Sequence, residues 1–300
     1  MLTARCACLA RIKSLRKLGI LAGGGELPIR LARHCAATGR PFFVIRLKGM
    51  ADAELAAFDG ADVGVAELGK YLSALRGAGC EAVCLAGIVK RPDFSALKPD
   101  LRGLKALPGA IAAARRGDDA LLRFLVSEFE SEGFAVEGAH EVAGGMTLAH
   151  GPLGKLTPGP AHMTDLHKAF HVAGEIGRLD VGQGAVVCEG LVLAVEAQEG
   201  TDAMLARCAE LPEALHGTPQ DRKGVLAKRP KPIQEQRVDL PAIGVATVRA
   251  AAKAGLAGIA GEAGKVLVLD HAAVAKAADE CGLFVYGLDP KDLPPDWADE

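Results

Sequence analysis

The chain has 300 residues, of which 50% are hydrophobic and 24% are charged, enough apolar material for two domains with packed cores. Its 35 basic and 37 acidic side chains give a net charge of −2, which excludes the strongly basic surface typical of a nucleic-acid-binding protein. Aromatic residues make up only 4%, which argues against a protein that stacks the bases of a single strand.

Eight cysteines are spread along the chain without a Cys-x-x-Cys pair, so neither a zinc ribbon nor a thioredoxin-like site is supported. Most lie in apolar stretches, as in the run CEAVCLAG at residues 80–87, where reduced, buried thiols are the ordinary interpretation. No apolar run is long enough to cross a bilayer. These features favour a protein of a reducing compartment.

The first residues, 1–14, are basic and carry no acid, and their apolar core is too short for a secretory signal. We interpret them as a disordered tail or a mis-assigned start, and an anchor on a membrane surface is the alternative. The first predicted strand follows at residues 18–22, and a glycine turn leads into a helix that ends at Gly39. Leu27, Leu31 and Cys35 recur at helical spacing along that helix.

Strands and helices then alternate through the first half of the chain. Short apolar strands are predicted at residues 41–47, 61–66 and 81–87, and helices at residues 67–79 and 118–133. Asp118 and Asp119 lie at the start of the second of these helices, where they suit the helix dipole. Such alternation is typical of α/β proteins, so we predict a domain with a Rossmann-like, doubly wound sheet over residues 15–147.

Residues 144–162 are rich in Gly, Pro and Thr and lack periodicity, which marks the best domain boundary in the chain. After it, helices are predicted at residues 163–179, 203–211, 246–255 and 271–282, and strands at residues 184–190, 191–197, 224–230, 256–261, 265–270 and 283–288. We expect the first two strands to form a hairpin through Glu189 and Gly190, and Asp270 to cap the last helix. We predict a second α/β domain, with a mixed sheet, over residues 151–300.

The glycine turn at Gly23, Gly24 and Gly25 is the first candidate site. Where a strand ends and a helix begins, bare backbone N–H groups and the helix dipole can hold an anion. The run fails as a dinucleotide fingerprint, because Pro28 stands where that motif has Gly or Ala. We predict a nucleotide site here, and the alternative is a tight turn that requires glycine backbone angles.

Basic residues follow two other strands of this predicted sheet. Lys90 and Arg91 come after the strand at residues 81–87, at the carboxyl edge where ligands bind in such folds. The alternative for them is a solvated basic loop. The end of the strand at residues 41–47 offers Arg46, with no acidic residue for a ribose.

Carboxylates crowd a strand-to-helix connection in the second half, in the run AVEAQEGTDAM. Glu196, Glu199 and Asp202 lie so close in sequence that they either repel one another or share a cation. Such hard oxygens suit Mg²⁺, which takes one or two carboxylates together with water and substrate phosphate. The alternative is a helix cap made by Thr201 or Asp202.

The run AKRPKPIQEQRVDLP places a lone aspartate beside a basic segment. Lys228, Arg229, Lys231 and Arg237 make a positive wall that suits the oxygens of a diphosphate. Asp239 beside them could bind a metal or orient a water for attack on phosphorus, and its alternative is a turn in which it pairs with Arg237.

Two histidines, His167 and His171, are four residues apart on the helix predicted at residues 163–179. The glutamate of a His-Glu-x-x-His zinc motif is missing and no third ligand is evident. We therefore interpret them as part of a solvated helix face.

Four motifs together resemble a known family. The runs KLGILAGGGELP, AVEAQEGTDAM, KRPKPIQEQRVDLPAIGVATV and AGLAGIAGEAG are similar, in this order, to the LpxI-type UDP-2,3-diacylglucosamine pyrophosphatases. The similarity runs from about Lys17 to Leu288 and leaves residues 1–14 outside. One departure is visible, since the family often carries Asp after Gln in the third motif, where this chain has Glu235.

The resemblance implies a cytoplasmic hydrolase of lipid A synthesis in Gram-negative bacteria. With Mg²⁺ it would split UDP-2,3-diacylglucosamine by attack of water on the α-phosphate, giving UMP and 2,3-diacylglucosamine 1-phosphate (lipid X). It further implies that the N-terminal domain binds the nucleotide, that the C-terminal domain binds the acyl-sugar, and that Asp239 is the critical aspartate. The amphipathic substrate would bring the enzyme to the inner face of the inner membrane, and the sequence leaves a homodimer open.

The predicted site combines the residue patterns with this resemblance. Asp239 is the candidate catalytic residue and, together with Glu196 and Glu199, a candidate Mg²⁺ ligand. The candidate substrate-binding residues are Gly23, Gly24, Gly25, Leu27, Pro28, Lys90, Arg91, Gly200, Thr201, Asp202, Lys228, Lys231 and Arg237. Two rivals are an NADP-linked oxidoreductase, suggested by the strand–glycine–helix opening and Arg46, and a non-enzymatic carrier of a nucleotide-sugar or lipid.

Overall fold

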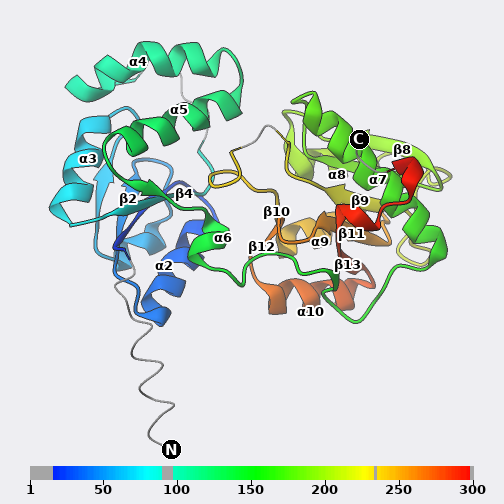
Figure 1. The fold of residues 1–300 in the computed structure, drawn as a ribbon. Helices are drawn as coiled ribbons and strands as arrows, with labels where there is room; N and C mark the ends of the chain where they lie inside the picture. Colours follow the sequence, from blue (N-terminus) through cyan, green and yellow to red (C-terminus); the bar gives the residue numbers. More distant parts are fainter. Residues whose placement is uncertain (1–15, 90–96, 233–234, 298–300) are drawn as a thin grey trace, which may run out of the picture. The chain divides into compact units, whose positions relative to one another are not determined.

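The chain folds into two compact units, Met1–Ala143 and Gly144–Glu300, each built on its own sheet (Figure 1). The computed structural model describes residues 16–89, 97–232 and 235–297. The tail predicted at residues 1–14 therefore lies outside the described residues. Two α/β units, one with a parallel and one with a mixed sheet, confirm the predicted fold class.

A parallel five-stranded sheet in the order β3-β2-β1-β4-β5 forms the centre of the first unit. Its strands are β1 (Leu18–Ala22), β2 (Phe42–Leu47), β3 (Gly60–Val63), β4 (Ala82–Ala86) and β5 (Ala135–Val136). Every residue of β1 is buried, as its continuous apolar sequence requires. Because β2 and β4 flank β1 on opposite sides, the strand order reverses between β1 and β4, which is the switch point of a doubly wound sheet.

Helices and one 3₁₀ turn connect these strands: α2 (Glu26–Thr38), η1 (Ala53–Ala57), α3 (Leu68–Gly77), α4 (Leu101–Ala114), α5 (Asp118–Ser131) and α6 (Ala139–Val142). Helix α4 was not predicted. Its Gly103, Pro108 and Gly109 resemble helix breakers in the sequence, but the two glycines are required by packing. A Cβ at position 103 would lie 2.0 Å from the Ala66 carbonyl oxygen, and one at position 109 would lie 2.7 Å from the Phe124 ring.

The second unit contains a mixed six-stranded sheet in the order β6-β13-β11-β9-β7-β8. Its strands are β6 (Gly151–Pro152), β7 (Gly184–Cys188), β8 (Leu191–Val195), β9 (Val225–Lys228), β11 (Gly258–Glu262) and β13 (Phe284–Leu288). Strands β9, β11 and β13 are parallel, while β7 is antiparallel to both β9 and β8. Consequently β8, β9, β11 and β13 all end at the same edge of the sheet.

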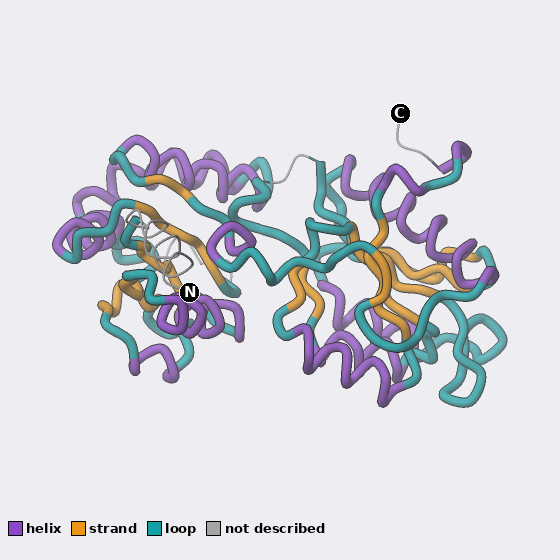
Figure 2. The backbone as a smooth tube through the Cα atoms, turned by 60° about the horizontal axis from the view of Figure 1, so that its bottom comes forward, coloured by secondary structure: helices purple, strands orange, loops and turns teal. Residues whose placement is uncertain are grey.

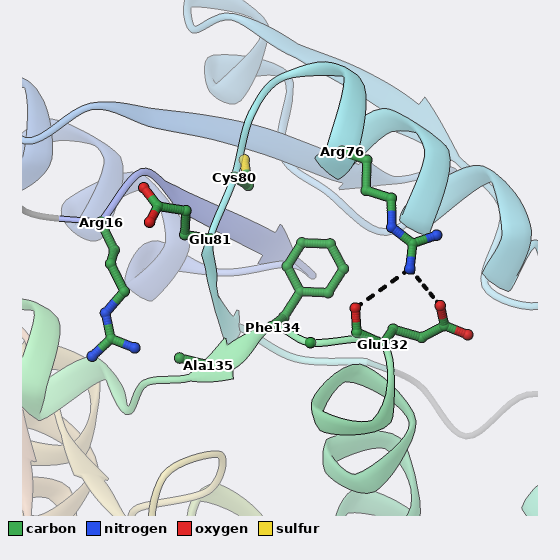
Figure 3. A pocket seen from close by; sticks show the side chains of 8 residues that line it. Arg16, Arg76, Cys80, Glu81, Glu132, Phe134 and Ala135 are labelled. Carbon is green, nitrogen blue, oxygen red and sulfur yellow. Dashed lines mark hydrogen bonds and ion pairs between the residues drawn. The ribbon is translucent and has the colours of Figure 1, made fainter.

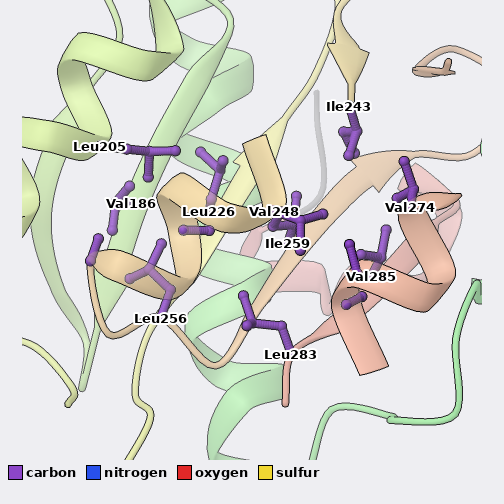
Figure 4. Close-up of a cluster of buried hydrophobic side chains, with 14 of the residues drawn as sticks. Val186, Leu205, Leu226, Ile243, Val248, Leu256, Ile259, Val274, Leu283 and Val285 are labelled. Carbon is purple, nitrogen blue, oxygen red and sulfur yellow. The ribbon is translucent and has the colours of Figure 1, made fainter. Parts of the chain in front are cut away.

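Helices cover both faces of this sheet (Figure 2). They are α7 (Pro160–Arg178), α8 (Gly200–Ala209), α9 (Val245–Lys253) and α10 (His271–Cys281), followed by the 3₁₀ turns η2 (Pro290–Asp292) and η3 (Pro295–Trp297). Helix α7 packs on one face through Leu166 and Phe170. Helices α8, α9 and α10 bury Leu205, Val248 and Val274 against the other face, with Leu226, Ile259 and Val285 from the strands (Figure 4).

Two local predictions for the second unit are confirmed, and one strand assignment needs correction. Strands β7 and β8 form the expected hairpin, and both turn residues, Glu189 and Gly190, have positive φ angles. Asp270 caps α10 by accepting a hydrogen bond from the Ala273 N–H at 2.9 Å. The strand expected at residues 265–270 is reduced to β12 (Leu267–Val268), which pairs with β10 (Ala242–Ile243) in a separate two-stranded sheet.

No helix in the described parts of the chain combines the length and apolar character needed to span a membrane.

Most of the cysteines among the described residues are buried, as predicted. Five free thiols are buried, those of Cys35, Cys80, Cys84, Cys188 and Cys208, whereas Cys281 is half-buried. Burial raises the pKa of the Cys84 thiol to about 12 and that of the Cys188 thiol to about 11.

Because the thiolate is the reactive form, we expect iodoacetamide at pH 8 to alkylate Cys281 and to spare the five buried cysteines. Peptide mass spectrometry of native protein, with urea-unfolded protein as the control, measures this directly. Alkylation of Cys84 at the rate of Cys281 would contradict the buried β4.

Candidate functional site

The glycine turn lies at the switch point of the first sheet, but its N–H groups are already engaged. Gly23 N–H donates to the Ala86 carbonyl at 2.9 Å, and Gly24 N–H donates to the Ile88 carbonyl at 2.9 Å. Gly25 N–H donates to the Asp52 carboxylate at 2.7 Å. In this conformation the residues therefore form the tight turn that was the alternative to a nucleotide site. None of these three N–H donors is available to a phosphate.

Backbone angles and close contacts explain why Gly23 and Gly25 are glycines. Gly25 has a φ angle of +90°, and a Cβ on Gly23 would lie 2.5 Å from the Ile88 carbonyl oxygen. Leu27 and Pro28 lie in the first turn of α2, where Leu27 is half-buried and Pro28 is buried. The predicted substrate contacts of these two residues are thus limited to the exposed part of Leu27.

An aspartate, Asp52, does follow β2. It lies five residues beyond the strand, is exposed, and reaches the start of α2 through Gly25. Arg46, by contrast, is part of the sheet, where it bonds Asp62 on β3 at 2.9 Å and the Phe58 carbonyl at 3.2 Å. The last residues of β2 carry no acid, and Asp52 lies in the loop beyond them.

A hollow of about 390 Å³ lies at the opposite, amino end of this sheet (Figure 3). Arg76 and Glu132 on its wall pair with each other, and Arg76 also stacks over Phe134 at 6.0 Å. Because ligands of doubly wound sheets bind at the carboxyl edge, we do not assign the substrate to this hollow. Lys90 and Arg91, which were predicted at the carboxyl edge, lie outside the described residues.

The carboxyl edge of the second sheet carries a buried lysine. Lys228 is the last residue of β9 and is 4% exposed. Its ammonium donates to the Thr201 hydroxyl at 2.8 Å and to the Ala242 carbonyl at 3.1 Å. It thereby connects the end of β9 to the start of β10 and to the first turn of α8.

Glu196 completes this arrangement from the end of β8. The Thr201 hydroxyl donates to Glu196 Oε1 at 2.9 Å. Because this hydroxyl has one proton, it accepts from the Lys228 ammonium and donates to Glu196, so the hydrogen bonds run from Lys228 through Thr201 to Glu196. Glu196 is 5% exposed, and its backbone N–H bonds the Gly184 carbonyl at 2.8 Å. A Cβ at Gly184 would lie 2.5 Å from Glu196 Oε2, so glycine at this position leaves room for the carboxylate.

Three carboxylates act on Lys228 electrostatically. Burial lowers the pKa of Lys228 from its ordinary value, although the charges of Glu196, Asp202 and Asp239 oppose that change. The structure therefore brings together five of the predicted residues around the Lys228 ammonium: Glu196, Thr201, Asp202, Asp239 and Lys228 itself. We call these five residues the Lys228 cluster.

Other predicted site residues have ion-pair partners around this cluster. Glu199 is exposed and bonds Arg207 at 2.9 Å, and its own backbone N–H helps to hold its pKa below the ordinary value. Lys231 bonds Asp180 at 2.8 Å. Gly200 begins α8 with a φ angle of +79°.

Two further basic residues of the predicted wall have carboxylate partners. Arg237 makes two 2.9 Å contacts with the Glu235 carboxylate, which gives Glu235 a structural role beside Asp239. Arg229 bonds Glu262 at 3.1 Å and lies over the Phe170 ring at 4.3 Å. The basic wall is thus interleaved with acids, which its sequence alone did not indicate.

The two histidines of α7 are half-buried, so the face expected to be solvated is only partly so. His171 packs against Trp297 with ring centres 5.3 Å apart, and burial lowers the pKa of His167. In the described parts of the chain, no three His, Cys, Asp or Glu side chains are gathered for a metal ion.

One atom of the Lys228 cluster is suited to a cation. Glu196 Oε2 is buried and has no hydrogen-bond partner. A buried carboxylate oxygen without a partner is costly unless a proton or a cation satisfies it. Mg²⁺ requires only one or two protein carboxylates when phosphate and water complete its shell, so the donors present fit that ion.

Comparison with known proteins matches both units to one family. The model of the LpxI N-terminal domain matches residues 17–146, and that of the LpxI C-terminal domain matches residues 149–286. The chain is 66% identical over 280 residues to "UDP-2,3-diacylglucosamine pyrophosphatase LpxI" of Caulobacter vibrioides. That match covers 93% of this chain and 100% of the relative.

Proposed function

The chain belongs to the LpxI family, and we propose that it is a hydrolase that cleaves the diphosphate of UDP-2,3-diacylglucosamine in lipid A synthesis. The observation that carries this proposal is the match of both units to the family, together with a relative of that name which the chain covers entirely. We further propose that water attacks the α-phosphate, so that the products are UMP and 2,3-diacylglucosamine 1-phosphate.

We propose the Lys228 cluster as the site of this chemistry. It lies where β8 and β9 end, at the edge of the sheet where ligands bind in α/β folds. Asp239 is half-buried in the turn that follows Glu235, and its carboxylate would orient the attacking water and accept its proton. The basic side chains of Lys231 and Arg237 lie on the same segment and would face substrate phosphate.

Asp239 and Glu196 are the proposed Mg²⁺ ligands. Glu199 would join them as a third ligand only if its ion pair with Arg207 broke. When bound, the ion would neutralise the charge that develops on the diphosphate oxygens. Calorimetric titration of the protein with Mg²⁺ tests this separately from activity. Glu196→Gln is expected to weaken Mg²⁺ binding, and unchanged binding would remove Glu196 from the ligand set.

We propose that the nucleoside binds at the glycine turn through Asp52 rather than through free N–H groups. Asp52 holds Gly25 with one carboxylate oxygen and is exposed, as an acceptor for ribose hydroxyls must be. Losing a hydrogen bond to a charged acceptor weakens binding by about 1.5 kcal/mol or more.

Asp52→Ala is therefore expected to raise KM about tenfold and to leave kcat nearly unchanged. Initial rates at varied substrate concentrations measure both constants. Asp59→Ala, which removes another exposed aspartate of the same unit, is the matched control. An unchanged KM in Asp52→Ala would exclude Asp52 from the nucleoside site.

Peripheral contact with the inner face of the inner membrane and formation of a homodimer are further parts of the proposal.

Phosphorus NMR of purified protein with UDP-2,3-diacylglucosamine, with Mg²⁺ and then with EDTA, tests the hydrolysis. Signals of UMP and the sugar phosphate that depend on Mg²⁺ are the expected result. Substrate that binds without turnover under every metal condition would support the carrier instead.

A further inference from the structure

The most deeply buried positions of helix α4 carry small residues. Gly103 and Ala114 are its buried residues, and Gly109 faces the Phe124 ring of α5. Figure 1 shows α4 lying along α5 on the outside of the first unit. A helix that covers a sheet or another helix usually turns its largest apolar side chains inward.

Two of the four large apolar residues of α4 point outward, whereas Leu107 and Ile111 are half-buried. Leu101 is 83% exposed and Leu104 is 57% exposed, and Pro108 and Ala112 are exposed as well. The spacing of these four residues, three, four and four positions apart, places them on one side of the helix. We call Leu101, Leu104, Pro108 and Ala112 the α4 outer face.

Positive charge borders the α4 outer face. Lys105, Arg115 and Arg116 are exposed, and among the described residues no ion pair engages any of the three. The segment 101–116 contains no acid. The fourth cation, Arg102, turns toward α5 instead and pairs with Glu128 and Glu132.

We propose that the α4 outer face docks onto an anionic lipid bilayer. An apolar stripe bordered by Lys and Arg is the pattern that inserts at the boundary between headgroups and acyl chains. A symmetric contact between two copies through this face is disfavoured, because it would bring Lys105, Arg115 and Arg116 of each copy close to the same cations of the other. The α4 outer face belongs to the first unit and the Lys228 cluster to the second, so docking does not depend on the proposed hydrolysis.

The test is co-sedimentation of the full chain with vesicles of phosphatidylcholine alone or mixed with phosphatidylglycerol. We expect binding to the mixed vesicles that weakens with added salt. Each of Lys105→Gln, Arg115→Gln and Arg116→Gln should lower the partition coefficient about fivefold, from about 1 kcal/mol per cation at an anionic surface. The double variant Leu101→Ser/Leu104→Ser should lower it at least about tenfold.

Matched controls lie in the second unit. Leu179→Ser removes a leucine that is 75% exposed, and Lys276→Gln removes a lysine whose side chain is 76% exposed. Both should bind vesicles as the unchanged chain does. Circular dichroism checks that each variant is folded, and hydrolysis of detergent-dispersed substrate, which should be unchanged, keeps docking distinct from catalysis.

Three results would overturn the proposal. The α4 variants could bind mixed vesicles as well as the unchanged chain, which would assign binding elsewhere, for example to the basic residues within 1–15. The chain could fail to bind mixed vesicles at all. Sedimentation equilibrium could show that Leu101→Ser/Leu104→Ser dissociates a dimer, which would make this face a contact between copies.

Discussion

Replacing Asp239 with asparagine is expected to lower kcat for UDP-2,3-diacylglucosamine hydrolysis about a thousandfold, the loss typical when a group that acts on the transition state is removed. Asparagine has the shape of aspartate but cannot accept the proton of an attacking water. The turn itself is held by main-chain bonds from Val238 and Asp239 to the Glu235 carbonyl, so the fold should persist.

Single-turnover rates of Asp239→Asn and circular dichroism measure the two parts of this prediction. Asp221→Asn, which changes an aspartate with 77% side-chain exposure in the same unit, is the matched control and should keep full activity. Undiminished turnover by Asp239→Asn would remove Asp239 from the catalytic role.

Replacing Lys228 with methionine is expected to destabilise the second unit by about 3 kcal/mol, the cost typical of removing one partner from a buried charge network. Methionine fills similar space but removes the buried cation on which the charges of Glu196, Asp202 and Asp239 act. It also removes the hydrogen bonds to Thr201 and the Ala242 carbonyl.

Urea unfolding followed by tryptophan fluorescence measures this loss in the second unit, because the single tryptophan of the chain, Trp297, lies there. Lys223→Met is the matched control, since its partner Glu189 is exposed and such surface pairs contribute about 1 kcal/mol or less. Equal stability of Lys228→Met and the unchanged chain would mean that the cost of burying the ammonium cancels its attraction to the three carboxylates.

Local sequence patterns were sufficient to predict both sheets and most of the strands and helices that form and cover them. The apolar run of β1, the turn at Glu189 and Gly190 and the cap at Asp270 each depend on residues adjacent in sequence. Such features can be predicted because the physics that decides them acts over a few residues.

Packing over long sequence separations decided what the sequence analysis missed. Helix α4 tolerates its glycines because the Ala66 carbonyl and the Phe124 ring approach them closely. Asp52 reaches Gly25 across 27 positions, and Arg229 finds Glu262 across 33. These partners are set by the fold and leave no spacing signal in the chain.

In the candidate site, too, residue types could be predicted from the sequence, whereas burial and partners could not. Glu196, Asp202 and Asp239 were selected because their residue types suit a cation, and they are neighbours through Lys228. Lys228 itself was predicted as part of a positive wall for diphosphate oxygens, yet it is buried and donates to Thr201 and the Ala242 carbonyl. The burial of a charged residue at the end of a strand depends on the layers packed around it.

The most direct test of the central claim is turnover of UDP-2,3-diacylglucosamine by the purified chain in ¹⁸O-labelled water with Mg²⁺, followed by phosphorus NMR. Attack on the α-phosphate predicts that the label appears in UMP and that the sugar phosphate stays unlabelled. Label in the sugar phosphate would contradict the proposed attack, and bound substrate that is never cleaved would contradict the assignment of the hydrolase itself.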